Sequence, residues 1–597
     1  MTIVEKLSAL RSLMKERGID VYIIPTSDFH ETEYVGEYFK ARHYMSGFSG
    51  SAGSLVVCAD CAGLWTDGRY FIQAAKELED TTIDLMKMGE EDTPLMAQYV
   101  YDHVSEGGAI GFDGRVINTK LAEAFAGKIK AKNARILCDE DLVGMIWEDR
   151  PALAAEKAFA LDVKYCGKAS AEKLAMVRSR MKELGCTTHI VTSLDDIAWL
   201  LNMRGNDIAC YPVCLSYLMI QEEQATLFVD EAKVDDTLRA QFASDGVSIC
   251  PYHAIYEAVK QVSDHEVILL DKGTVNYKIT SNLPGNVTVK ACKNPSQLWK
   301  AIKNDVELEN NRWAHIKDGV AVTNFMYWLK TNVGKEAISE VRAADYLEEC
   351  RKAQENFIEI SFDTIAAYNA NGAMMHYHAS EDNCSMLQPE GFLLVDSGGQ
   401  YFEGTTDITR TFVLGPISEK MRTHFTSVLR GMMNLSRATF LHDCTGINLD
   451  ILARGPLWDD GIDYRCGTGH GVGFLLNVHE GPNGFRWKKV PERNDSETLE
   501  AGMVTTIEPG VYLEGEYGIR HENELITQKG EKNEYGQFMN FETITFVPFD
   551  LDGIDVEMLT KAERTWLNSY HKEVYAKISP YVSDEVKAWL KEYTREI

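Results

Sequence analysis

An internal repeat is the feature that most constrains the fold of this 597-residue sequence. Four residues recur 167 positions later, where Leu7, Leu10, Met14 and Gly18 match Leu174, Val177, Met181 and Gly185. The spacing of three and then four positions places the apolar residues on one face of a helix. The glycine that follows suits the C-cap, where a residue free to adopt positive φ is favoured.

Each of the two predicted helices leads into a short strand and then into a turn rich in Ser and Asp. The strands are expected at 21–24 and 189–191, and the turns at 26–28 and 192–195. Further along, Leu64-Trp65-Thr66-Asp67 is similar to Leu227-Phe228-Val229-Asp230. The shared order of these pieces predicts two related α/β domains, at 1–158 and 159–302.

The third predicted domain covers 303–597 and mixes helices with strands. Apolar residues at 322, 325, 326 and 329 predict an amphipathic helix. Strands are expected at 391–395 and 407–414, and two further strands within 502–527. Residues 487–498 predict a surface loop, and the chain is expected to be helical again from about 553, with Leu567, Tyr570 and Val574 on one face.

The charge balance excludes some classes of partner. The formal net charge is −29, which disfavours binding to nucleic acid or to an anionic membrane surface. No apolar stretch approaches the roughly 18 residues of a membrane span. The charged N-terminal segment 1–18 lacks the apolar region of a signal peptide, so a cytoplasmic protein is expected.

The thirteen cysteines also favour a reducing compartment, because an odd and scattered set does not form a disulfide framework. Cys58 and Cys61 form a lone C-x-x-C with no second pair nearby. Its strand-like flanks favour a pair of buried thiols over a metal or redox motif.

Five polar residues in the third domain point to chemistry. Asp396 closes one predicted strand and Asp407 opens the next, so a hairpin can place the two carboxylates side by side. Glu508 and Glu522 lie on two strand-like runs joined by a glycine-rich turn, and His470 lies among four glycines. Two carboxylates in contact repel each other, and one takes up a proton unless a cation lies between them.

Taken singly, each of these acids is an ordinary surface residue. Together, four carboxylates and one imidazole on apolar strands match two divalent cations in charge, because a buried acidic cluster needs such compensation. Two ions about 3.5–4 Å apart can generate hydroxide and polarise a carbonyl. Ligands dominated by oxygen favour Mn²⁺, with Zn²⁺ or Co²⁺ as alternatives.

In this order and with these flanks, the five residues resemble those of the pita-bread metallopeptidases, which include methionine aminopeptidase, prolidase and Xaa-Pro aminopeptidase. The resemblance is greatest to the long, three-domain Xaa-Pro aminopeptidases, or aminopeptidase P. It covers essentially the whole chain, including segments 46–53, 64–70 and 199–205. It implies an α/β (α+β) chain with two creatinase-like domains, a pita-bread catalytic domain and a helical C-terminal extension.

The resemblance also implies roles for the five residues. Asp396 would bind one metal ion, Asp407 and Glu522 would bridge both, and His470 and Glu508 would bind the other. Glu508 would in addition act as the general base. Arg520 would pair with Asp396 from outside the ligand set.

Further residues enter through the same resemblance. His376 and His479 match family histidines that contact substrate and stabilise the intermediate, whereas the neighbouring His378 is not expected to take part. Arg69 is a possible substrate contact from the first domain, with local packing as the alternative. Many relatives have histidine where this chain has Cys466, which leaves the substrate contact at that position open.

The implied reaction is hydrolysis of the bond between an N-terminal residue and a following proline, by a hydroxide bridging two metal ions. The implied partners are peptides with proline at the second position, and a homodimer is expected. Two alternatives are a prolidase limited to dipeptides and a non-catalytic peptide-binding module. The repeated N-terminal domain counts against the first, and the intact ligand set counts against the second.

Overall fold

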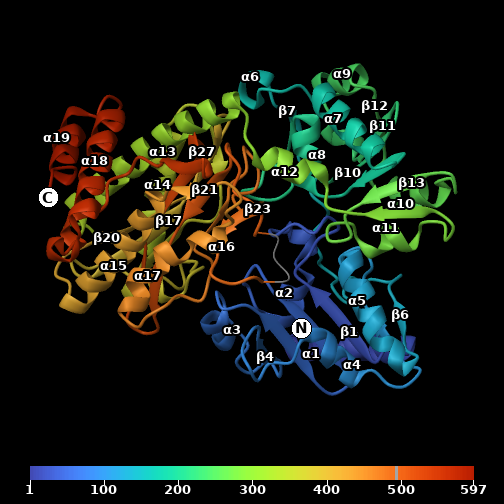
Figure 1. Ribbon diagram of the computed structural model, residues 1–597. Coiled ribbons are helices and arrows are strands. Elements are labelled where there is room, and N and C mark those ends of the chain that lie inside the picture. The colour runs from blue at the N-terminus through green and yellow to red at the C-terminus, as the bar shows by residue number, and fades with distance from the viewer. Residues whose placement is uncertain (491–494) are drawn as a thin grey trace. The chain divides into compact units, whose positions relative to one another are not determined.

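The computed structural model describes residues 1–490 and 495–597, and the chain forms two compact units. Unit 1 comprises Met1–Leu161 and Lys168–Ser296, and unit 2 comprises Asp162–Gly167 and Gln297–Ile597. In Figure 1 unit 1 runs from blue to green and most of unit 2 from green to red. Among the described residues, no helix is long and apolar enough to cross a membrane.

The first half of unit 1 contains a six-stranded sheet in the order β4-β3-β2-β1-β5-β6. The central strand β1 pairs antiparallel with β2 and parallel with β5. The elements are α1 (Ile3–Arg17), β1 (Val21–Pro25), α2 (Ala41–Ser46), β2 (Ser54–Cys58), β3 (Ala62–Thr66), α3 (Phe71–Glu77), β4 (Asp84–Lys87), α4 (Met96–His103), β5 (Ala109–Gly111), α5 (Thr119–Ile129) and β6 (Arg135–Leu137).

The second half of unit 1 repeats this topology, with the sheet order β12-β11-β10-β8-β13-β14. Strand β8 occupies the place of β1, because it pairs antiparallel with β10 and parallel with β13. The elements are β7 (Phe159–Ala160), α7 (Ser170–Glu183), β8 (Thr188–Val191), α8 (Leu194–Leu201), β9 (Met203–Arg204), β10 (Ser216–Gln221), β11 (Ala225–Val229), α9 (Asp236–Ser244), β12 (Val247–Cys250), α10 (Ile255–Ala258), β13 (Val267–Leu270), α11 (Tyr277–Ser281) and β14 (Thr288–Ala291).

The repeated helix α1 and its counterpart α7 form as their sequence spacing predicts. Leu7, Leu10 and Met14 are buried on one face of α1, and their repeat partners are buried on α7. Both helices are followed by a glycine with φ of +65°, which a residue without Cβ adopts at little cost. The predicted pair of related α/β domains is therefore confirmed.

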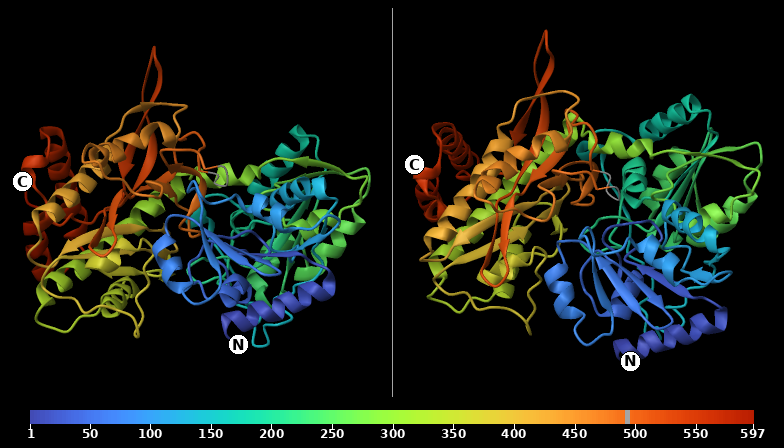
Figure 2. Two further views of the ribbon diagram at one scale, coloured as in Figure 1. Left: turned by 90° about the horizontal axis from the view of Figure 1, so that it is seen from below. Right: turned by 60° about the horizontal axis from the view of Figure 1, so that its bottom comes forward.

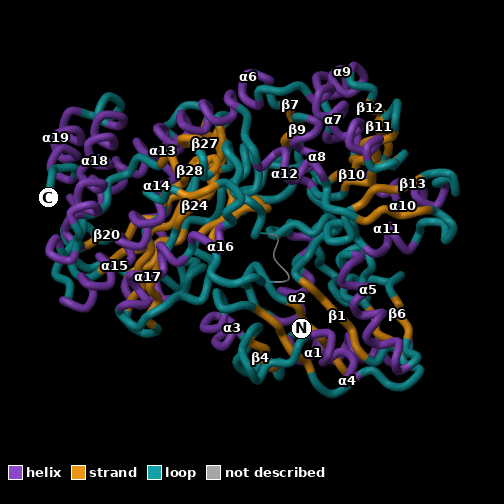
Figure 3. Tube along the Cα trace, viewed as in Figure 1, coloured by secondary structure: helices purple, strands orange, loops and turns teal. Residues whose placement is uncertain are grey.

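Unit 1 also holds the two-stranded sheet β7-β9, and unit 2 carries four sheets that lie among helices (Figure 3). Their strand orders are β15-β18-β19, β16-β17-β20, β21-β28-β27-β24-β22-β23 and β25-β26. The helices are α6 (Val163–Cys166), α13 (Asp305–Asn332), α14 (Glu340–Lys352), α15 (Glu419–Ser436), α16 (Gly446–Leu449), α17 (Ile451–Asp459), α18 (Lys561–Ile578) and α19 (Asp584–Tyr593), and α12 (Pro295–Ala301) spans the boundary of the two units.

The strands of unit 2 are short, and several of them frame the acidic residues. They are β15 (Phe357–Ile360), β16 (Ile365–Tyr368), β17 (Phe392–Ser397), β18 (Gly399–Tyr401), β19 (Gly404–Thr405), β20 (Ile408–Val413), β21 (Phe440–Leu441), β22 (Gly469–Gly471), β23 (Glu480–Phe485), β24 (Val504–Ile507), β25 (Gly510–Leu513), β26 (Tyr517–Arg520), β27 (Asn523–Asn533) and β28 (Gly536–Thr543).

Two details differ from the sequence prediction. The segment 502–527 holds four strands, β24 to β27, where two were expected. Between Asp396 and Asp407 the chain does not form a simple hairpin, because β18 and β19 pair with each other and β18 joins β15. Strands of two to four residues are too short for an alternating pattern to reveal them. In the predicted loop 487–498, residues 491–494 lie outside the described residues.

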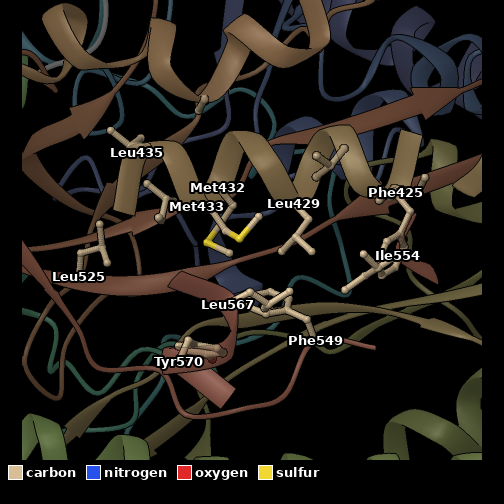
Figure 4. Close-up of a cluster of buried hydrophobic side chains, with 14 of the residues drawn as sticks. Phe425, Leu429, Met432, Met433, Leu435, Leu525, Phe549, Ile554, Leu567 and Tyr570 are labelled. Atoms are coloured by element: carbon tan, nitrogen blue, oxygen red, sulfur yellow. The ribbon is translucent and has the colours of Figure 1, made fainter. Parts of the chain in front are cut away.

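The core of unit 2 is built around α15. Figure 4 shows Phe425, Leu429, Met432 and Met433 of this helix facing side chains from β27, α18 and the chain between them. The predicted apolar face of the C-terminal helix lies in the same core: Leu567, Tyr570 and Val574 are buried. The hairpin of β27 and β28 extends away from this core (Figure 2), and its tip is exposed.

Candidate active site

The first two predicted ligands lie at the ends of adjacent strands. Asp396 is the fifth residue of β17, and Asp407 immediately precedes β20. These strands pair antiparallel with Asp396 opposite Thr409, so Asp407 lies two residues from the partner of Asp396. Both side chains are almost entirely buried.

The other three predicted ligands come from β22, β24 and β27. Ile507 of β24 lies opposite Asn523 of β27, which brings Glu508 and Glu522 next to each other just beyond that pair. His470 is the middle residue of β22, whose backbone approaches β24 closely: a Cβ on Gly469 would lie 1.9 Å from the carbonyl oxygen of Thr506. The glycine before His470 is thus required by packing.

The structure brings these side chains within reach of one another. His470 Nε2 lies 3.4 Å from Asp407 Oδ2 and 3.4 Å from Glu508 Oε1. Asp407, His470 and Glu522 each offer one potential ligand atom, and these three atoms all lie within 4.8 Å of one another. Asp396 is joined to this group through Arg520, whose guanidinium donates to Asp396 Oδ2 and lies 4.0 Å from Glu508 Oε2.

Hydrogen bonds fix the orientation of two of the predicted ligands. His470 Nδ1 lies 2.9 Å from the carbonyl oxygen of Gly471, so it donates there and leaves Nε2 with a free lone pair toward the acids. Thr409 donates to Glu522 Oε2 at 2.7 Å. Such outer contacts set the direction in which a ligand presents its electrons.

The acids repel one another strongly. Burial, followed by the charges of Asp396 and Glu508, raises the pKa of Asp407 well above its usual range. Burial, followed by the charges of Asp407 and Glu508, does the same to the pKa of Glu522. With protons as the only counter-charge, these two acids would thus hold a proton to higher pH than isolated carboxyls do.

The donor atoms fit a pair of divalent cations. Asp396 Oδ1 and Glu522 Oε1 are buried and make no hydrogen bond to any described residue. A buried carboxylate oxygen without a donor is costly unless a cation satisfies it. Four carboxylates with one imidazole suit ions of the Mn²⁺, Co²⁺ or Zn²⁺ type.

Of the two predicted substrate histidines, His479 packs against a predicted ligand, and His376 follows a residue that Arg520 contacts. The rings of His479 and His470 meet edge to face with centroids 4.3 Å apart. His376 is half-buried and follows Met375, whose carbonyl oxygen accepts a hydrogen bond from Arg520 at 3.4 Å. The neighbouring His378 is exposed, and its exclusion from the site stays a prediction.

Cys466, where many relatives have histidine, also lies near the cluster. Burial, and after it the charge of Glu508, raises the pKa of this thiol to about 11. The side chain is therefore neutral at physiological pH and offers only a weak S–H donor.

Arg69 belongs to unit 1 and is engaged locally. Its guanidinium donates to both carboxylate oxygens of Asp67, at 2.9 and 2.8 Å, and lies 3.7 Å from Glu33. These contacts match the local-packing alternative, and a role for Arg69 in substrate binding remains a prediction.

Sequence reasoning missed a buried pair behind Asp407. Glu524 accepts a hydrogen bond from the backbone N–H of Asp407 at 2.7 Å, and its other oxygen lies 3.2 Å from His315 Nε2. Both side chains are fully buried. The local pattern offered no clear signal, because the buried face of α13 also carries Glu307, Lys317 and Asp318.

Comparison with known proteins agrees with this geometry. Family models match the chain in four places: the creatinase/prolidase N-terminal domain at 6–140 and again at 149–307, metallopeptidase family M24 at 309–529, and the C-terminal region of peptidase M24 at 537–597.

Curated relatives match over nearly the full length. A protein of Neurospora crassa described as a probable Xaa-Pro aminopeptidase P is 40% identical, over 97% of this chain and 86% of its own. Aminopeptidase P2 of Arabidopsis thaliana is 38% identical over 99% and 88%. A crystal structure of X-prolyl aminopeptidase from Caenorhabditis elegans, described as a cytosolic enzyme with a di-nuclear active site, superposes with a TM-score of 0.95 at 34% identity over 100% of both chains.

Two creatinase-like domains followed by a domain with an acidic cluster on adjacent strands define a metallopeptidase of the pita-bread class. The four matches and the full-length relatives narrow this further. The chain belongs to metallopeptidase family M24, within its aminopeptidase P group.

Proposed function

We propose that the protein is an Xaa-Pro aminopeptidase, which removes one N-terminal residue from peptides with proline at the second position. The observation that supports this most directly is the convergence of Asp407, His470 and Glu522 within 4.8 Å in a chain that is 40% identical to an aminopeptidase P relative. The preference for proline rests on the relatives.

We assign the metal ligands as Asp396, Asp407, His470, Glu508 and Glu522, with Asp407 and Glu522 as bridges. Two divalent ions, for which Mn²⁺ is the first choice, would supply an acidified water and polarise the scissile carbonyl. Arg520 would hold Asp396 in position and offset part of the negative charge, since its guanidinium donates to that carboxylate.

Glu508 is the proposed proton carrier. Its side chain is 22% exposed, against 11% for Asp396 and 6% for Asp407, so it is the acid that solvent and substrate reach most readily. It would accept a proton from the attacking water and return it to the proline nitrogen, which must be protonated to leave as a neutral amine.

The two histidines would act on the substrate side. His479, edge-on to His470, would donate to the oxyanion that forms at the scissile carbonyl. His376 would contact the peptide near the same carbonyl. Arg69 is retained as a candidate substrate contact, although its guanidinium already pairs with Asp67.

The activity test uses metal-loaded protein with Arg-Pro-Pro and Arg-Ala-Ala. Release of arginine from the first peptide alone is expected, and equal release from both would reject the preference for proline. The dipeptide Arg-Pro tests the prolidase alternative, because a prolidase would cleave it and leave the tripeptide intact.

Two further proposals concern the setting of the enzyme. A cytoplasmic location is supported by the relative from Caenorhabditis elegans, which is described as cytosolic. A homodimer is expected from the family resemblance, and light scattering would show about twice the chain mass of 67.1 kDa. A mass of one chain at micromolar concentration would contradict the dimer.

A further inference from the structure

A second group of metal-ligating side chains lies in unit 1, and it uses the lone C-x-x-C. Cys58 ends β2 and Cys61 precedes β3, so the two thiols flank a tight hairpin. The N–H of Cys58 donates to the carbonyl oxygen of Cys61 at 2.9 Å. Arg11 donates to the carbonyl oxygens of both cysteines, each at 2.9 Å. The hairpin therefore presents two thiols from a braced backbone.

The third side chain comes from 42 positions later in the sequence. His103 is the last residue of α4, and its Nδ1 lies 2.9 Å from the carbonyl oxygen of Tyr99, one helical turn earlier. A hydrogen bond from Nδ1 leaves Nε2 as the ring's acceptor. Cys58, Cys61 and His103 each offer one ligand atom, and these three atoms all lie within 4.8 Å of one another.

We propose that Cys58, Cys61 and His103 bind a thiophilic d¹⁰ cation, Zn²⁺, at a site separate from the catalytic centre. Two thiolates and one imidazole are ligands that Zn²⁺ prefers, with a fourth position left for water. In a tetrahedral site such ligand atoms lie roughly 3.5–3.8 Å apart, given Zn–S near 2.3 Å and Zn–N near 2.1 Å. Small side-chain rotations close the remaining gap.

Charge and outer contacts support this assignment. Two thiolates neutralise Zn²⁺, so the site adds no net charge to the hairpin. The hydroxyl of Tyr99 donates to Cys61 Sγ at 3.1 Å, and the same residue orients His103. One tyrosine thus contacts two of the three ligands, as outer partners of metal sites commonly do.

Cys58 is buried and Cys61 is half-buried. A protonated thiol is a weak nucleophile, whereas Zn²⁺ binding displaces the protons and releases them to solvent. The alternative of a Cys58–Cys61 disulfide is one outcome of the experiment below.

The test uses the reduced, metal-free full-length chain titrated with Co²⁺, which replaces Zn²⁺ and reports on thiolate ligands. We expect an intense thiolate-to-cobalt absorption band whose final intensity corresponds to one sulfur-bound Co²⁺ per chain and which disappears when Zn²⁺ is added. The proposed catalytic ligands include no sulfur, so the band reports on the cysteine site alone. Metal analysis should give three ions per chain.

Matched variants locate the signal. His103→Asn changes an exposed side chain, so folding is preserved, and it should lower the stoichiometry from three ions to two and abolish tight Co²⁺ binding at this site. Cys61→Ser should have the same effect. Cys138→Ser, which changes a partly buried thiol of the same domain, should retain the band. Asp407→Asn should retain it as well, although at least one catalytic ion is lost.

Three results would overturn the proposal. The first is a wild-type chain that shows no thiolate band with Co²⁺. The second is a band that survives His103→Asn or Cys61→Ser unchanged. The third is a Cys58–Cys61 disulfide, identified by mass spectrometry, in protein purified without reductant and saturated with Zn²⁺.

Discussion

Burial and the neighbouring carboxylates disfavour the charged forms of Asp407 and Glu522. Asp407 and Glu522 are buried beside two further carboxylates, which raise the pKa of both. Arg520 offsets part of that charge at Asp396. The remaining repulsion makes the cluster a strong cation site, and single substitutions should therefore act first on metal binding.

Asp407→Asn removes one charge and one bridging oxygen from the cluster. We expect loss of at least one metal ion per chain and a fall in kcat/KM of at least about 100-fold. Loss of a residue that only supports a ligand costs up to about 100-fold, and loss of a ligand should cost at least as much. Metal quantification and peptide hydrolysis check this. Asp382→Asn, at an exposed position of the same unit, is the control. Full activity in Asp407→Asn would remove its assignment as a bridge.

The same pKa shifts predict how the chelated protein responds to pH. Because the folded pKa values of Asp407 and Glu522 exceed those of the unfolded chain, the folded state binds more protons between the two values. Stability must then fall as pH rises through that window.

We therefore expect the chelated protein to have a higher Tm at pH 5 than at pH 7.5. Bound divalent ions should remove most of this difference, and so should Asp407→Asn in the chelated state. Thermal unfolding with and without chelator is the measurement. If the Tm of the chelated protein instead rises from pH 5 to pH 7.5, and Asp407→Asn removes that rise, the pKa values of these two acids are not raised.

His479→Ala separates binding of metal from turnover. His479 packs against His470 but lies outside the proposed ligand set, so we expect unchanged metal content and a fall in kcat of roughly 10²–10³-fold, as for the loss of an oxyanion donor. His378→Ala, at an exposed position, is the matched control. If His479→Ala loses metal, the residue is a ligand or supports one.

The five proposed ligands were predictable because their flanking motifs are distinctive and lie close in sequence to each residue. Their outer contacts were not. Thr409, Glu524 and His315 orient or support ligands from other strands and from α13, and only the tertiary fold brings them there. The C-x-x-C shows the same limit, since His103 joins it across 42 residues.

Among the elements, helices α13 and α14 are joined to the ligand strands by a buried ion pair. Arg351 of α14 donates to Asp318 of α13 at 2.6 and 3.1 Å, and both side chains are fully buried. Arg351 also donates to Ser397, and Thr406 donates to Asp318 at 2.8 Å. Ser397 follows Asp396 and Thr406 precedes Asp407, so this pair positions both acids.

Asp318→Asn should therefore affect both stability and the site. Loss of one partner leaves a buried charge unpaired, which costs about 3–5 kcal/mol in the free energy of unfolding. Denaturant unfolding measures the stability, and metal titration should show weaker binding by the folded fraction. Glu348→Gln removes the exposed pair with Lys352 and should change stability by less than about 0.5 kcal/mol. Equal effects of the two substitutions would contradict this role.

The elements themselves were predicted unevenly. Long amphipathic helices such as α1, α7 and α18 show clear periodicity, and the structure confirms them. The strands of two to four residues around the acids do not show it, and β18, β19, β25 and β26 changed the expected connections. In these segments, pairing with distant strands decides the conformation and the local pattern does not.

For the whole molecule, the net charge of −29 predicts how substrates approach. A strongly negative protein attracts cationic peptides over distances comparable to the Debye length, which shrinks from about 30 Å at 0.01 M salt to about 8 Å at 0.15 M. We expect kcat/KM for Arg-Pro-Pro to fall by up to about tenfold over this range.

The comparison peptides are Leu-Pro-Pro and Asp-Pro-Pro. The first should change less than Arg-Pro-Pro, and the second should be cleaved relatively better as salt rises. Initial rates at low substrate concentration give kcat/KM directly. The same salt response for all three peptides would show that charge does not steer their binding.

At this scale the sequence was most informative. The 167-residue repeat predicted two related domains, and the two six-stranded sheets of unit 1 have the same strand order. The repeat was detectable because helices, strands and turns recur in one order, even though few residues are identical. Pairing partners within each sheet depend on tertiary contacts and were not readable.

The hairpin of β25 and β26 has a practical consequence for anyone who wishes to modify this molecule. The hairpin is the segment of chain between Glu508 and Glu522. The pairing of β24 with β27 keeps those two residues in register. The tip of the hairpin at Glu514–Glu516 is exposed. A peptide tag or a fluorescent reporter spliced into that tip would sit a few residues along the chain from the reaction centre without altering its alignment.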